Sequence, residues 1–142
     1  MADPRLAVAY DGIGAVFASF KIDNSTIVYS ATENGGAATI GRAVNLSAAD
    51  TIQLAGDGEA VLGKLIKVES DNTAVVQIAG AMTLPAGAGA SLTLGKKIVG
   101  AASAAPANGY IREVNTGAAA ELGVCRGVIL DAGTTTAVEV YL

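Results

Sequence analysis

The apolar residues of this 142-residue chain come in short runs, and turn-forming residues interrupt each run after a few positions. Residues 66–69 alternate between apolar and polar side chains, Ser70-Asp-Asn predicts a turn, and residues 73–78 alternate again. Alternation with a period of two is typical of half-buried strands rather than of amphipathic helices. We therefore expect a β-hairpin over residues 66–78.

The same pattern of apolar runs and turns recurs along the rest of the chain. It predicts strands over residues 13–22, 26–30, 39–46, 51–54, 97–101, 109–115, 127–131 and 134–142. Asn34-Gly is a hairpin-turn signal after the second of these strands, and residues 132–133 predict a turn before the last. Residues 117–122 predict a single turn of helix that Gly123 ends.

Many short strands at regular spacing predict an all-β protein, either a small β-barrel or a sandwich of short antiparallel strands. The length fits a single β-rich domain over residues 1–142. Residues 1–12 contain Pro4 and precede the first strand pattern, which begins at Ile13. They therefore predict an extended N-terminal arm.

Large side chains are scarce in this chain. Hydrophobic residues make up 51% of it, but only 4% are aromatic, and much of the rest is alanine, which buries little area. A lone domain of this composition would have a thin core. We expect oligomerisation to supply part of the missing burial.

The chain has no histidine and only one cysteine, so it lacks most of the side chains that enzymes commonly use for catalysis. It cannot form a Ser-His-Asp triad, a Cys–His pair or a histidine-based zinc site. The glycines near Lys96 do not have phosphate-loop spacing, and a calcium loop starting at Asp57 would place Val61 and Val68 at ligand positions. We therefore expect no enzyme activity, no catalytic residues, no cofactor and no metal.

The charge pattern bears on which partners the chain can have. The formal net charge is −4, and the nine basic residues are scattered, whereas nucleic-acid binding needs a basic stripe. Residues 72–95 are uncharged, but Gln77, Pro85 and several glycines interrupt them, so they do not predict a membrane span. We expect a soluble chain with no direct nucleic-acid partner and no membrane partner. The basic residues expected on polar faces or loops, either solvated or paired with carboxylates across an interface, are Lys64, Lys67, Lys96, Lys97, Arg112 and Arg126.

Three segments of the chain resemble a known family. They are Gly41-Arg-Ala-Val-Asn-Leu-Ser, residues 55–69, and the ending in which Gly127-Val-Ile-Leu-Asp is followed by Val138-Glu-Val-Tyr-Leu. Together they resemble the capsid decoration, or cement, proteins of tailed bacteriophages. The resemblance covers roughly residues 38–142, and its motifs are strands and turns rather than catalytic signatures.

The resemblance implies a small β-rich protein that binds the outside of an expanded icosahedral capsid. Such proteins commonly form homotrimers that contact the major capsid protein, bridge capsomers and stabilise the head against internal DNA pressure. The implied location is the outer capsid surface of the virion, after synthesis in the host cytoplasm. Because terminal arms often make the capsid contacts in this family, residues 3–10 are the candidate capsid-contacting arm. The arm residues singled out are Pro4, Arg5, Leu6 and Tyr10.

Two other classes of protein fit the sequence as well. One is another self-assembling structural protein, such as a tail or surface-layer component, which would form open or cyclic assemblies unaided. The other is a small carbohydrate-binding β module, which would bind glycans as a purified protein. The scarcity of aromatic side chains weighs against the second class.

Overall fold

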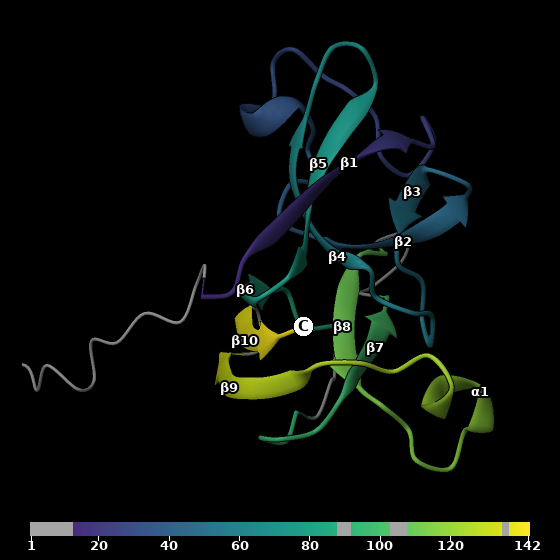
Figure 1. Cartoon of the computed structure of the whole chain (residues 1–142), viewed down its shortest axis with the longest axis vertical. Helices are drawn as coiled ribbons and strands as arrows, with labels where there is room; N and C mark the ends of the chain where they lie inside the picture. Colours follow the sequence, from purple (N-terminus) through teal and green to yellow (C-terminus); the bar gives the residue numbers. More distant parts are fainter. Residues whose placement is uncertain (1–12, 88–91, 103–107, 135–136) are drawn as a thin grey trace, which may run out of the picture.

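The computed structural model describes residues 13–87, 92–102, 108–134 and 137–142. Within these residues the fold is all-β, which confirms the predicted class (Figure 1). The strands are β1 (Val16–Ile22), β2 (Ala43–Ala48), β3 (Thr51–Leu54), β4 (Gly63–Val68), β5 (Thr73–Ala79), β6 (Ala81–Leu84), β7 (Ile98–Ala101), β8 (Tyr110–Glu113), β9 (Val128–Thr134) and β10 (Ala137–Tyr141). One short helix, α1 (Ala119–Leu122), and one 3-10 turn, η2 (Asn34–Gly36), complete the elements.

The first half of the chain forms a closed barrel with the strand order β1-β3-β2-β4-β5. Its ladders are antiparallel, as predicted, except that β1 and β3 run parallel over two residue pairs, Lys21 with Thr51 and Ile22 with Ile52. The inward side chains form one core cluster. Its largest members are Ile22, Ile27, Val44, Ile52, Leu54, Leu65, Val68 and Val76.

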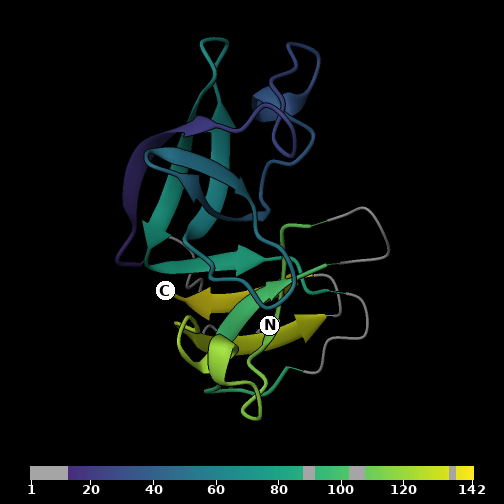
Figure 2. The same cartoon turned by 90° about the vertical axis from the view of Figure 1, so that its right-hand side faces the viewer.

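The second half forms a three-stranded sheet, β6-β10-β9, and a two-stranded hairpin, β7-β8. Figure 2 shows both beneath the barrel, with β6 directly under the end of β5. Only Gly80 separates β5 from β6 in the sequence, so the two halves are joined without a linker. A second core cluster lies mainly here, and its largest members are Val61, Met82, Leu84, Ile98, Ile111, Ile129, Val138 and Val140.

Several local predictions are confirmed. β4 and β5 form the predicted hairpin around the turn at residues 69–72. The alternation near the C-terminus is also correct, because Val138 and Val140 are fully buried while Tyr141 is exposed. The predicted single turn of helix is α1, and it ends at Gly123.

The predicted strand over residues 26–30 is wrong. The Asp23 carboxylate accepts hydrogen bonds from the backbone N–H groups of Ser25, Thr26 and Ile27, and these bonds fold the segment into a loop. The predicted hairpin turn at Asn34-Gly is wrong as well, since η2 occupies it. The bonds to Asp23 are local side-chain hydrogen bonds, which compete with strand pairing.

Two further boundaries differ from the predictions. Residues 132–133, the predicted turn, belong to β9, which extends to Thr134. β6 was not predicted, because its four residues show no clear alternation before Pro85. Among the described residues, no helix has the length and apolar character needed to cross a membrane.

Candidate functional site

The predicted arm residues Pro4, Arg5, Leu6 and Tyr10 lie outside the described residues. The structure does describe the residues that directly follow the predicted arm. The carbonyl oxygen of Ile13 accepts a hydrogen bond from the N–H of Ala81 at 2.8 Å. A Cβ atom at Gly14 would lie 2.8 Å from the hydroxyl oxygen of Tyr141. The junction is therefore held beside β6 and β10.

Large apolar side chains are exposed around this junction. Ile13 and Phe17 are each 55% exposed, and Val16 is nearly as open. Tyr141 reaches Gly14 and is paired across the sheet with Val128, so these two side chains share the outer face of β10 and β9. We call this set the β1–β10 surface, and its exposed members are Ile13, Val16, Phe17, Val128, Leu130 and Tyr141.

β1 also leaves part of one edge without a neighbouring strand. It pairs with β5 from Val16 to Lys21, but with β3 only at Lys21 and Ile22. The N–H of Lys21 donates to the carbonyl oxygen of Asp50 at 2.8 Å on the β3 side. Strand alternation directs the outward backbone groups of Phe17 and Ser19 to that same side, where no described residue bonds them. Such an edge is a template for an added strand.

A carboxylate–guanidinium cluster joins α1 to the rest of the fold. The Nε of Arg112 donates to Asp57 Oδ1 at 2.8 Å, and both of its Nη atoms donate to the carboxylate of Glu121. The N–H of Asn115 also donates to Glu121, at 2.8 Å. These contacts lower the pKa of Glu121 to about 2, first through the Arg112 hydrogen bonds and then through Asn115. The same cluster raises the pKa of Arg112, through Glu121 first and Asp57 second.

The lowered pKa of Glu121 predicts a specific pH dependence of stability. Its folded-state pKa is about 2 against an ordinary value of 4.5, so the ionised form stabilises the fold above about pH 4.5. That contribution is lost progressively as the pH falls toward 2. We expect Glu121→Gln to lower the urea midpoint at pH 7 and to flatten the loss of stability between pH 5 and 2.

The control for this prediction is Glu69→Gln. Glu69 pairs with Lys67 at 2.9 Å on the surface, where both side chains are about half exposed and the pair contributes little. At each pH, the urea midpoint of Glu69→Gln should differ little from that of the unaltered chain. A Glu121→Gln protein that keeps the full acid dependence of the original chain would contradict the assignment.

The structure locates the other basic residues singled out in the sequence. The guanidinium of Arg126 donates to the backbone oxygens of Leu62 and Ile78, both at 2.9 Å. Lys67 and Arg112 pair with carboxylates of the same chain. These three side chains therefore bond to groups of the same chain. Lys96 and Lys97 are exposed.

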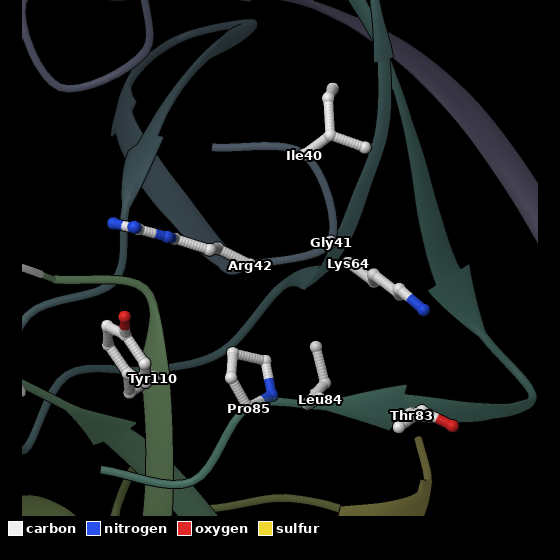
Figure 3. A pocket seen from close by; sticks show the side chains of 8 residues that line it. All are labelled: Ile40, Gly41, Arg42, Lys64, Thr83, Leu84, Pro85 and Tyr110. Carbon is white, nitrogen blue, oxygen red and sulfur yellow. The ribbon is translucent and has the colours of Figure 1, made fainter. Parts of the chain in front are cut away.

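Two basic side chains lie at a groove between the barrel and β6. The groove holds about 300 Å³ and is lined by Ile40, Arg42, Lys64, Leu84, Pro85 and Tyr110, among others. Figure 3 shows Arg42 extending toward Tyr110 and Lys64 extending toward Thr83, with Pro85 and Leu84 between them. The carbon at the centre of the Arg42 guanidinium lies 5.3 Å from the centroid of the Tyr110 ring. Cationic groups therefore flank an apolar centre.

Sequence reasoning missed most of these residues. Arg42 lies just before β2 and meets Tyr110 because the N–H of Ala43 donates to the carbonyl oxygen of Gly109 at 2.7 Å, and no local pattern connects the two residues. Tyr141 was foreseeable, since alternation along residues 134–142 already placed it opposite the core positions. Val128 was not foreseeable, because the apolar residues at the start of β9 show no alternation that would separate its two faces.

The described residues contain no group of three or more cysteine, aspartate or glutamate side chains placed to hold a metal ion. Asp57, Glu121 and Asp23 instead bond to groups of the same chain and shape its loops. The arrangement provides three surfaces for contact with a partner. They are the β1–β10 surface, the free edge of β1 and the groove between the barrel and β6. Searches against protein-family models, curated proteins and solved structures give no match to this chain.

Proposed function

We propose that this chain is a structural virion protein that binds the outside of an icosahedral phage capsid. In this role it forms a homotrimer, contacts the major capsid protein, bridges capsomers and stabilises the head against internal DNA pressure. The observation that carries the proposal is the β1–β10 surface, which exposes large apolar side chains where residues 1–12 join the fold. Apolar patches of this kind mark interaction sites on soluble proteins.

The free edge of β1 supports the same proposal. A protein that clamps capsomers together needs no chemistry, and its strength comes from buried area, strand pairing and avidity over several subunits. The edge beside Phe17 and Ser19 offers strand pairing, and Phe17 offers apolar area at the same place. An extended segment of a neighbouring subunit would continue the sheet there.

The same free edge favours a second candidate, a structural protein that assembles by itself into open polymers. Light scattering on the purified chain across a dilution series separates the two. A discrete trimer is expected for a decoration protein, and an open-ended size distribution favours the second candidate. The partner for a sedimentation test is expanded phage heads, prepared without this protein from the virus that encodes it. A chain that is monomeric and also fails to sediment with these heads would refute both candidates.

Phe17→Ser is expected to weaken assembly. Truncating an aromatic side chain at the centre of an interface costs about 2 kcal/mol, or about thirtyfold in the dissociation constant. The side chain is 55% exposed, so its loss should leave the stability of the fold nearly unchanged. The measurements are sedimentation with heads and light scattering, together with a thermal melt.

The matched control is Leu122→Ser. Leu122 is 49% exposed on α1, away from β1 (Figure 1). Equal weakening by both variants would remove the β1–β10 surface from the proposal. Deletion of residues 3–10 tests the arm separately, with lost capsid binding and intact folding as the expected result. Unchanged binding would refute the arm assignment.

A further inference from the structure

We propose that the groove between the barrel and β6 binds an extended acidic peptide segment of a partner protein. The groove shares no residue with the β1–β10 surface, so this inference is independent of the proposed function. It starts from an imbalance of charge. The chain has 13 acidic and nine basic residues, yet the groove is lined by Arg42 and Lys64 and by no acidic side chain among the described residues.

Neither cation is neutralised within the described part of the chain. The polar contact of the Arg42 guanidinium is one long hydrogen bond, from Nη1 to the carbonyl oxygen of Asn108 at 3.4 Å. Lys64 has neither an ion pair nor a hydrogen bond from its ammonium group there. Lys67 and Arg112, by contrast, both have carboxylate partners. Two unpaired cations at one groove favour an anionic ligand.

Backbone hydrogen bonds hold the two segments that carry these cations beside each other. The N–H of Leu65 donates to the carbonyl oxygen of Arg42 at 2.9 Å, and Gly41 donates back to Leu65 at 2.8 Å. The Tyr110 ring lies under the Arg42 guanidinium and limits its orientations. Because the Arg42 guanidinium is restrained before a ligand arrives, it loses less side-chain freedom on binding.

The shape of the groove selects an extended peptide. Its centre is apolar, with Leu84 fully buried in the floor, and the charged ends of Arg42 and Lys64 lie at opposite sides (Figure 3). In an extended chain, alternate side chains share a face and recur about every 6.6 Å. A probe segment with an acidic residue two positions before and two positions after an apolar residue presents all three side chains on one face, the apolar one for the groove centre and one carboxylate for each cation. A nucleic acid fits poorly, since two cations on a net negative chain form no basic stripe.

The test is fluorescence anisotropy with the full chain and a blocked, labelled peptide, Ser-Asp-Ser-Leu-Ser-Asp-Ser, at low ionic strength. We expect a dissociation constant between about 0.1 and 1 mM, because two charge-assisted contacts must offset the cost of ordering the peptide. Arg42→Gln and Lys64→Gln should each weaken binding about tenfold. The peptide with both aspartates replaced by asparagine should bind at least tenfold more weakly than the original.

The control variant is Lys97→Gln, which removes the same charge from an exposed position outside the groove. Its binding should match that of the unaltered chain, and Arg42→Lys should keep part of the affinity that Arg42→Gln loses. Thermal melts confirm that each variant is folded. The proposal is overturned if Lys97→Gln weakens binding as much as Arg42→Gln, if the asparagine peptide binds equally well, or if no binding occurs at millimolar protein.

Discussion

Replacing Gly36 with alanine is expected to lower the free energy of unfolding by about 2–6 kcal/mol. Gly36 has a φ of +93°, a conformation that costs other residues about 1–3 kcal/mol. A Cβ atom there would also overlap the carbonyl oxygen of Val68, and relieving an overlap of this kind costs about 1–3 kcal/mol more. The oxygen cannot easily move away, because Val68 is a backbone-paired residue of β4 and is buried in the barrel core.

The chain supplies a matched control for this result. Gly95 has a φ of +81°, but a Cβ atom there would meet nothing within 4 Å. Gly95→Ala therefore measures the backbone cost alone, about 1–2 kcal/mol. Urea unfolding of the two variants separates the conformational cost from the steric cost. Equal losses in both would show that the loop at Gly36 moves away from β4 freely.

The elements that sequence predicted best are those whose partners are close in the chain. The β4–β5 hairpin needs only a short turn, and its alternation reflects one face toward the barrel core and one face away from it. β10 is similar, since Val138 and Val140 point to the core. In these elements a local pattern and a local turn determine the structure, so the sequence alone was sufficient.

The elements that sequence missed depend on partners far away in the chain. β6 is short, and it forms a strand because β10 pairs with it from the other end of the sequence. The parallel contact of β1 with β3 has no local signal either, since it depends on how the barrel closes. The groove shares this property, because Arg42, which precedes β2, and Tyr110, which lies in β8, are remote in sequence. Neither the closure of the barrel nor the groove was therefore predictable from local pattern.

The loop over residues 24–30 shows how a local polar residue overrides an apolar pattern. Burial alone raises the pKa of Asp23, but hydrogen bonds from Ile27, Thr26 and Ser25 outweigh it and hold the pKa below its ordinary value. The Thr26 hydroxyl also accepts a hydrogen bond from the N–H of Leu54 at 2.9 Å, which docks the loop on β3. The result is that Ile27 enters the barrel core as part of a loop rather than as part of a strand.

Ile27→Ala is accordingly expected to lower the free energy of unfolding by about 2–5 kcal/mol, the usual cost of removing a large aliphatic side chain from a packed core. Ile27 is 0% exposed, and its neighbour Val28 is 54% exposed. Val28→Ala is therefore the control, with an expected change within about 0.5 kcal/mol. Urea unfolding at neutral pH measures both, and similar losses would contradict the assignment of Ile27 to the core.

The role of Asp23 can be separated from that of Ile27 by combining the two changes. If the Asp23 carboxylate positions the loop so that Ile27 is buried, Asp23→Ala already removes part of the stabilisation that Ile27 provides. The double variant Asp23→Ala, Ile27→Ala should then lose less stability than the sum of the two single losses. Strict additivity would mean that Ile27 reaches the core without the hydrogen bonds from the loop to Asp23, and that the apolar side chain alone directs the segment into the barrel.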